Sequence, residues 1–279
     1  MSIVRDRALL LRRTPYAESS LVAQVFTRTQ GRLHLMAKGA FRRTSRYYCV
    51  LDLFDTLEIE ASTRRDSDLA LLRAASVRER RRAPRRDLAA YKTGLQMLEL
   101  CDLAVRPGQP DEELFDLLEW SLNVLETDPE RSPAQTLIEF ELGFLQSLGL
   151  APALARCASC GKEAPPVARG EEGASSRVAF SAGAGGRLCL DCARSARSAG
   201  KRVGTLPESL LQDADLLSGR QLLPISASNP AAEFCETTTL EAAMMSCTLA
   251  STMATFVSVR HRARTCAAVS SRWAGCSLT

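Results

Sequence analysis

Two pairs of cysteines limit what this chain can fold into more than any other feature of its sequence. Cys157 and Cys160 form the first pair, Cys189 and Cys192 form the second, and two residues separate the thiols of each pair. A tight turn with this spacing directs both thiolates at one metal ion, and four thiolates complete the closed tetrahedral shell of a structural zinc site. Because a closed shell leaves no position for water or substrate, we expect zinc as a structural cofactor.

The surroundings of the pairs fit a small metal module. Between them lie 28 residues, somewhat more than in a usual zinc ribbon, and Gly161, Gly185 and Gly186 can adopt the positive φ values of metal-binding turns. Two chance pairs or a disulfide framework are the alternatives, and the latter needs an oxidising compartment. The N-terminus lacks a signal peptide's apolar segment, and no apolar stretch approaches the ~20 residues of a membrane span. We therefore expect a cytoplasmic protein with reduced thiols.

The first 80 residues have the pattern of β-strands. Short apolar or alternating runs, separated by turn signals, cover residues 8–11, 20–27, 32–36, 53–60 and 69–72. Five strands in so short a stretch predict a small closed barrel. An SH3-like barrel or a meander sheet fits the same pattern nearly as well.

Residues 84–150 change to a helical period. Apolar stripes predict helices over 88–102, 114–125 and 133–148. Ser132 and Gln135 form a capping box at the start of the third helix, Pro133 takes its first position, and Gly149 ends it. The helical pattern returns over 206–223, after the metal module. The composition of 242–279, which has no acidic residue, predicts no particular structure.

Charge is divided unevenly along the chain. Residues 1–92 carry 20 Lys and Arg against 10 Asp and Glu, a net charge of +10, whereas residues 93–150 carry 2 against 12, a net charge of −10. This division predicts one region suited to polyanions, and a neighbour suited to solvent or to a basic partner.

No catalytic constellation stands out in the sequence. The two histidines, His34 and His261, are far apart, and His34 alternates with leucines as a solvated residue on the polar face of a strand would. Phosphate-binding and nucleophile-elbow motifs are absent. The sequence therefore predicts a protein that is not an enzyme.

One basic stretch, residues 38–48, mixes cations with aromatic residues. Cations can neutralise phosphates and rings can stack on unpaired bases, which favours nucleic-acid binding over a solvated loop with one buried aromatic. Such contacts set affinity and not sequence preference. The candidate DNA-binding residues are Arg32, Lys38, Arg42, Arg43, Arg46 and Tyr47.

Two sets of residues together resemble the RecO family of bacterial recombination mediators. The first runs through residues 16–22, 26–27, 31–33, 37–45 and 51–54, and the second comprises the cysteine pairs with Phe180, Ser181, Gly185 and Gly186. The resemblance covers about residues 1–205. It implies an α+β protein with an N-terminal OB-fold over 1–80, a helical domain over 84–150 and 206–279, and an inserted four-cysteine zinc module over 151–205.

The resemblance also implies a function. Members bind single- and double-stranded DNA, anneal complementary strands, and help RecR to load RecA onto strands coated by single-strand-binding protein, whose acidic C-terminal tail is a further partner. Such a protein would act at the nucleoid. Lys38, Arg42 and Arg43 would be the main DNA contacts, and Cys157, Cys160, Cys189 and Cys192 the zinc ligands. A protein-binding scaffold without significant DNA binding is the competing hypothesis.

The C-terminal sequence departs from this family. Arg260, His261 and Arg262 match a basic helix, but the residues that follow do not resemble the usual apolar ending. One hypothesis is that this tail is read in a shifted frame, which sequencing the gene would decide. A departure here affects any partner surface built on the last helix.

Overall fold

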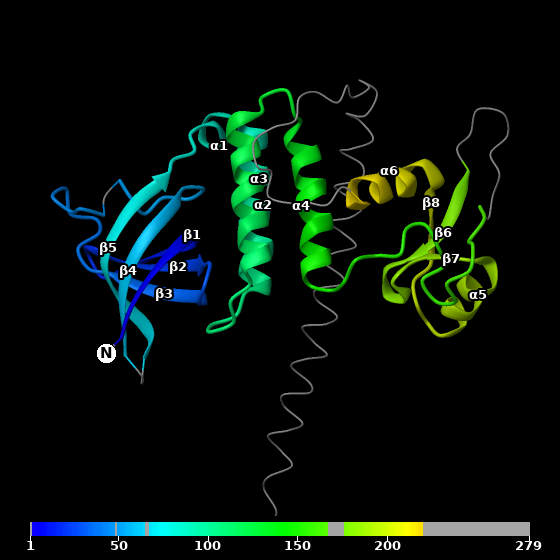
Figure 1. The fold of residues 1–279 in the computed structure, drawn as a ribbon, viewed down its shortest axis with the longest axis horizontal. Helices are drawn as coiled ribbons and strands as arrows, with labels where there is room; N and C mark the ends of the chain where they lie inside the picture. Colours follow the sequence, from blue (N-terminus) through cyan, green and yellow to red (C-terminus); the bar gives the residue numbers. More distant parts are fainter. Residues whose placement is uncertain (1, 48, 65–66, 167–175, 220–279) are drawn as a thin grey trace, which may run out of the picture. The chain divides into compact units, whose positions relative to one another are not determined.

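The fold was analysed in a computed structural model that describes residues 2–47, 49–64, 67–166 and 176–219 (Figure 1). The chain divides into two compact units, one ending at Ser147 and the other beginning at Leu148. Each unit has its own core and is described separately. Residues 220–279, with the end of the helical pattern predicted over 206–223 and the divergent tail, lie outside the described residues.

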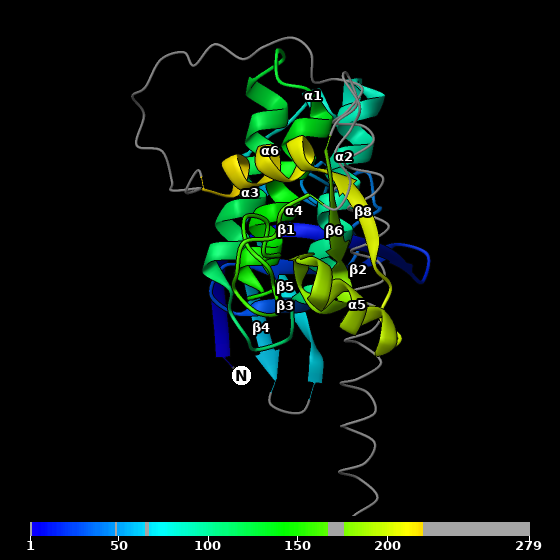
Figure 2. The ribbon, with the colours of Figure 1, turned by 90° about the vertical axis from the view of Figure 1, so that its right-hand side faces the viewer.

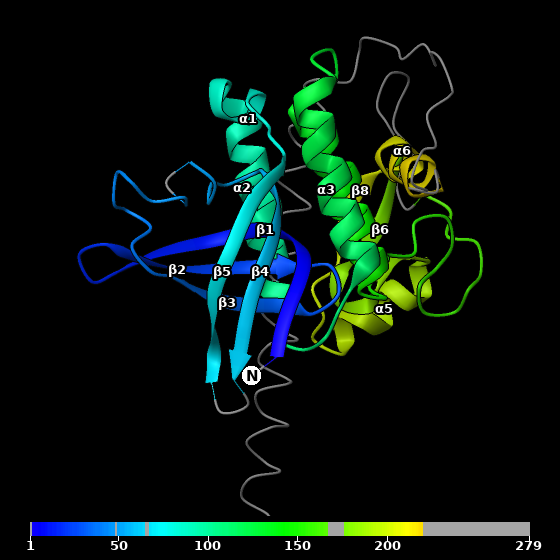
Figure 3. The same cartoon turned by 60° about the vertical axis from the view of Figure 1, so that its left-hand side comes forward.

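The first unit begins with a closed five-stranded barrel (Figure 3). Its strands are β1 (Ser2–Tyr16), β2 (Ser20–Thr27), β3 (Gly31–Ala37), β4 (Thr56–Arg64) and β5 (Ser67–Glu79). Neighbours around the barrel run in the order β1-β2-β3-β5-β4, and β1 pairs with β4 to close it. The β3–β5 pair is parallel, which excludes a meander. The predicted α+β fold with an N-terminal OB-type barrel is confirmed.

Alternating side chains of β2 fill the barrel, whereas β1 buries the continuous run 8–11. In β2, Leu21, Ala23 and Val25 are buried while the intervening residues are partly exposed. Several strand boundaries differ from the prediction, and β5, for example, runs from Ser67 to Glu79 where residues 69–72 were expected. β1 continues well beyond Leu11 because a bulge between Leu10 and Arg12 lets the ladder resume. β4 begins three residues later than predicted, since Phe54 has a φ of 70° and cannot belong to a strand.

Four helices follow the barrel in the described part of the first unit (Figure 1). They are α1 (Ala83–Arg86), α2 (Leu88–Ala104), α3 (Glu112–Thr127) and α4 (Pro133–Ser147). The side chains of Asp87 and Asp111 cap α2 and α3. The predicted capping box of α4 is confirmed, because Ala134 N–H donates to Ser132 Oγ and Ser132 N–H donates to Gln135 Oε1, both over 3.3 Å.

Two glycines let the barrel approach the helices closely. Gly31, with φ +70°, opens β3 beside the α2–α3 loop, and a Cβ at this position would lie 2.4 Å from the Arg106 carbonyl oxygen. Gly94 of α2 faces Phe54, where a Cβ would lie 2.7 Å from the ring. The neighbouring Arg32 N–H donates to the Arg106 carbonyl over 3.1 Å. These contacts fix the barrel against α2 and the loop that follows it.

The described part of the second unit contains a small sheet and two α-helices (Figure 2). Its elements are β6 (Arg177–Ser181), a 3-10 turn (Ala182–Ala184), β7 (Gly186–Leu188), α5 (Leu190–Ser198), β8 (Gly204–Pro207) and α6 (Glu208–Gly219). The sheet order is β7-β6-β8, with both pairs antiparallel. In the part of the chain that the structure describes, no helix has the length and hydrophobicity needed to cross a bilayer.

Candidate nucleic-acid interface and metal centre

The predicted basic stretch lies on a long loop between β3 and β4, which we call the basic loop (residues 38–55). The barrel anchors this loop at several points. Tyr47 and Leu51 are each 5% exposed and pack into the barrel core, and the Tyr47 hydroxyl donates to the carbonyls of Leu72 and Arg73 at 3.1 Å. Phe41 N–H donates to the Ser19 carbonyl of the β1–β2 hairpin over 3.0 Å. The loop therefore has a defined position at one end of the barrel.

The far end of the basic loop is held by arginines that follow β5. Arg80 donates to the Cys49 carbonyl over 2.7 Å, and Arg85 donates to the Leu53 carbonyl over 2.5 Å. Arg85 also forms an ion pair of 2.9 Å with the buried Asp55. Arg80 and Arg85 are not among the predicted DNA-binding residues. Their contacts anchor the loop without engaging Lys38, Arg42, Arg43 or Arg46.

Four predicted DNA-binding residues, Lys38, Arg42, Arg43 and Arg46, are exposed together on the anchored loop. Among the described residues, no carboxylate forms an ion pair with any of them. The Arg46 guanidinium lies 5.2 Å from the centre of the Tyr47 ring, which positions it without neutralising it. Unpaired cations on a fixed loop are available to phosphate groups.

Arg32 and Tyr47 do not join this surface. Arg32 points away from the loop toward α2, where it donates to the Asp102 carbonyl and forms an ion pair of 3.6 Å with the Asp102 carboxylate. Tyr47 is buried, so its ring cannot stack on a base. Both residues belong to the predicted set, and the structure gives them the roles of docking the barrel and anchoring the loop.

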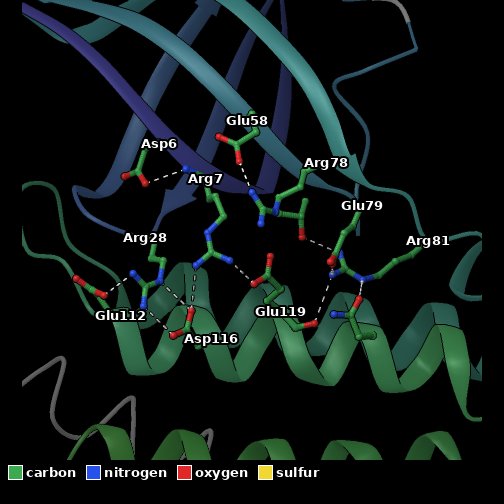
Figure 4. Close-up of polar contacts among 12 residues, drawn as sticks. Asp6, Arg7, Arg28, Glu58, Arg78, Glu79, Arg81, Glu112, Asp116 and Glu119 are labelled. Carbon is green, nitrogen blue, oxygen red and sulfur yellow. Dashed lines mark hydrogen bonds and ion pairs between the residues drawn. The ribbon is translucent and has the colours of Figure 1, made fainter. Parts of the chain in front are cut away.

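The helix-facing side of the barrel is also rich in arginine, but there Arg7, Arg28 and Arg81 each have an acidic partner. Arg7 donates to Glu119 over 2.9 Å, and Arg28 makes two bonds of 3.0 Å to Asp116 and an ion pair of 2.6 Å with Glu112. Figure 4 shows these side chains converging on one face of α3. The bond to Asp116 raises the pKa of Arg28, so this arginine remains charged. The predicted basic partner of the acidic helices is thus the chain's own barrel.

Arg81 is the centre of this helix-facing junction (Figure 4). Its side chain is 1% exposed and donates to Asn123 Oδ1 and the Phe54 carbonyl, each over 2.6 Å. It also donates to Glu79 over 2.9 Å. Burial lowers the pKa of Arg81, while the Glu79 carboxylate opposes that shift. A buried guanidinium with this many acceptors links β5, the basic loop and α3 in one arrangement.

The four cysteines of the second unit form a compact cluster. All four Sγ atoms lie within 4.8 Å of one another, and those of Cys160 and Cys189 are 3.8 Å apart. A tetrahedral ion with Zn–S bonds of about 2.3 Å places its sulfurs about 3.8 Å from each other. The cluster can therefore hold one metal ion, and its residue types suit zinc.

Local backbone geometry builds this cluster from two turns. In the first, Gly161 has a φ of +71° and its N–H donates to the Cys157 carbonyl over 2.9 Å. In the second, Cys189 is the N-cap of α5, which places Cys192 in the first helical turn. Gly186 has a φ of +139°, and a Cβ there would lie 2.3 Å from the Ala153 carbonyl oxygen. Gly161 and Gly186 therefore adopt the positive φ values that the sequence predicted for metal-binding turns.

Acid–base properties of the cluster also favour a cation. Burial acts to raise the pKa of Cys157, but hydrogen bonds from the backbone of Cys189, Cys160 and Ser159 lower it to about 6. The hydrogen bond with Cys189 raises the pKa of Cys192 to about 12. Four sulfurs at this separation cannot all ionise unless a positive ion lies between them.

Family models match nearly all of the described chain. "Recombination protein O N terminal" matches residues 1–81, which contain the barrel, and "Recombination protein O C terminal" matches residues 85–216, which contain the helices and the cysteine cluster. The chain belongs to the RecO family. Similar relatives carry the name DNA repair protein RecO, so this member is a DNA repair protein.

Two of these relatives show the extent of the similarity. RecO of Anaeromyxobacter sp. (strain K) is 37% identical over 218 residues, covering 77% of this chain and 82% of the relative. RecO of Geobacter metallireducens is 31% identical over 235 residues, covering 78% and 91%. The resemblance drawn from the sequence is therefore confirmed at the level of the family.

Proposed function

We propose that this RecO protein is a recombination mediator that binds single- and double-stranded DNA through the basic loop and anneals complementary strands. The observation that carries the proposal is the group of unpaired cations, Lys38, Arg42, Arg43 and Arg46, on an anchored loop of a DNA repair protein. The loop supplies phosphate contacts without reading a base sequence. Annealing two arbitrary complementary strands requires this kind of contact, since a sequence-specific reader would act on few substrates.

The proposed cellular role needs protein partners. With RecR, the protein would load RecA onto single strands coated by single-strand-binding protein, whose acidic C-terminal tail it would bind. These partners follow from the family resemblance, and we propose that the protein meets them on the DNA in the cytoplasm. It would act by binding and positioning strands, and not as an enzyme.

We propose that the cysteine cluster holds zinc as a structural ion. Among the described residues, the core cluster next to the cysteines is small, and it consists of Cys157, four alanines and Leu188. So small a core supplies little hydrophobic stabilisation, and metal binding would supply the rest. Removing the ion with a chelator should unfold the second unit and leave the barrel's circular-dichroism signal intact. Cys160→Ser should lower the zinc content, measured by atomic absorption, while Cys49→Ser should leave it unchanged.

Strand annealing tests the proposed function most completely. Complementary oligonucleotides carrying a donor and an acceptor dye are mixed, with and without single-strand-binding protein, and energy transfer reports pairing. We expect this RecO to accelerate pairing in both cases, and the Arg42→Ala, Arg43→Ala double variant to lose the acceleration. A protein that binds RecR but neither binds nor anneals DNA would be a scaffold, and that result would overturn the proposal.

A further inference from the structure

The β1–β2 hairpin and the basic loop are joined at the same end of the barrel (Figure 3). Tyr16 pairs with Ser20 across the hairpin, and the turn between them is tight because Ala17 has a left-handed φ of 52°. Phe41 N–H donates to the Ser19 carbonyl, and Gly39 N–H donates to Ser20 Oγ over 3.4 Å. Tyr16 and Phe41, far apart in the sequence, are thus carried by segments that are hydrogen-bonded to each other.

Both rings are exposed to solvent. Tyr16 is 57% exposed and Phe41 is 48% exposed. In the described part of the chain one other aromatic residue, Tyr91, is similarly accessible, and its ring packs edge-on against Phe54 at 5.5 Å. An exposed pair of rings beside unpaired cations indicates a surface that is covered by a ligand.

We infer that Tyr16 and Phe41 form a base-stacking edge beside the loop cations, so that this end of the barrel binds an unpaired nucleic-acid strand more tightly than a duplex. The inference rests on the proposed DNA binding and adds the strand type. An unpaired strand offers base faces to the rings and phosphates to Arg42 and Arg43. In a duplex the bases already stack on one another, so the rings gain nothing unless a base leaves the stack.

A mediator that anneals strands needs this preference. Because phosphates alone attract the loop cations, a site without rings would hold the duplex product as firmly as its single-stranded substrates. The stacking edge weakens binding once the strands have paired. Release of the product therefore follows from the chemistry of the site.

The experiment measures fluorescence anisotropy of the full chain with three labelled probes. These are an oligothymidylate, a strand of the same length made of abasic sites, and a duplex with the same number of phosphates. Tyr16→Ala and Phe41→Ala remove one ring each, Tyr16→Phe and Phe41→Tyr keep it, and Leu88→Ala removes an equally exposed apolar side chain from α2 as the matched control. Thermal unfolding checks that each variant is folded.

We expect each alanine variant to bind the oligothymidylate about fivefold more weakly or worse, and the abasic strand and duplex as the unchanged protein does. The ring-keeping variants and the Leu88 control should bind normally. Equal loss on all three probes, or no loss on oligothymidylate, would overturn the stacking edge. A steep salt dependence in those same measurements would still support DNA binding by the cations, so the two proposals fail separately. An acidic peptide serves as a fourth probe. If the alanine variants bind this peptide more weakly but bind all three DNA probes normally, the surface belongs to a protein partner, and the inference is overturned.

Discussion

The barrel presents basic side chains on two sides, and the two sides differ in what those side chains contact. On the helix-facing side, Arg7, Arg28 and Arg81 each reach a carboxylate or a carbonyl of the same unit. On the basic loop, Arg42 and Arg43 are exposed and have no acidic partner among the described residues. Both sides carry arginines, so the presence of arginine does not separate them.

We propose that pairing, and not net charge, distinguishes an arginine that stabilises the fold from an arginine that binds a ligand. A guanidinium that is buried with several acceptors holds elements together, and its removal leaves those acceptors unsatisfied. A guanidinium that is fixed in position without a partner keeps its charge available for a phosphate. Substitutions on either side test this distinction when stability and DNA binding are measured separately.

The largest effect is expected at Arg81. Arg81→Met removes donors to Asn123 and to the Phe54 carbonyl in a fully buried position, and should lower the free energy of unfolding by about 3 kcal/mol or more. Urea denaturation measures the change. The neighbouring Arg82, which is exposed, is the control, and Arg82→Met should stay within about 0.5 kcal/mol. Similar values for both variants would show that the buried network contributes nothing.

Glu141 is a buried acidic residue without a basic partner, since it is 3% exposed and its Oε2 atom has no hydrogen-bond partner among the described residues. Burial raises the pKa of Glu141 from 4.5 to about 7. The native state therefore retains a proton that the unfolded chain releases, and stability falls as pH rises from about 4.5 to about 7. Glu141→Gln should leave stability unchanged at acidic pH and raise it by roughly 2–3 kcal/mol above neutral pH. Denaturation curves at both pH values check this, and parallel pH profiles would contradict it.

A smaller effect is expected for the half-buried pair of Arg28 and Asp116. A double-mutant cycle with alanine at both positions should give a coupling energy of about 1 kcal/mol, because two parallel hydrogen bonds join the side chains. Arg5 and Glu60 form a more exposed pair of 2.8 Å and serve as the control. Their coupling should be about 0.5 kcal/mol or less. A larger coupling energy for Arg5 and Glu60 than for Arg28 and Asp116 would mean that burial does not determine how strongly these pairs interact.

The smallest change in stability is expected on the basic loop itself. Arg42→Ala and Arg43→Ala remove side chains that form no ion pair within the described part of the chain, so the free energy of unfolding should change by less than about 0.5 kcal/mol. Thermal unfolding of the double variant measures this. A large destabilisation would place these residues with the structural arginines and remove the contrast between the two sides.

Much of the fold could be predicted because its signals are local. The capping box at Ser132 and Gln135, the alternation in β2 and the spacing of the cysteine pairs are each legible within a few residues. Closure of the barrel is not local, since the parallel β3–β5 pair joins segments that no short pattern connects. The sequence alone therefore left an SH3-like barrel and a meander open.

The same limit explains which of the predicted site residues are exposed to solvent. Arg42 and Arg43 lie in a loop, where exposure follows from the local pattern. Arg32 lies on the polar face of β3, but that face meets α2 and its Asp102. Tyr47 is adjacent to exposed cations in the sequence, yet its ring is buried in the core of the barrel. Exposure of Tyr16 beside the loop depends on the hairpin contact and could not be seen in the sequence.

The salt dependence of single-strand binding tests the central claim most directly. The affinity for an oligothymidylate is measured across a range of salt concentrations for the unchanged protein, for the Arg42→Ala, Arg43→Ala variant, and for an Arg5→Ala, Arg78→Ala variant that removes two exposed but paired arginines. Each phosphate contact contributes about 0.7 to the slope of log affinity against log salt. We predict that the loop variant loses about 1.4 from the slope while the paired variant keeps it. Equal slopes for the loop variant and the unchanged protein would contradict the claim that the basic loop binds DNA.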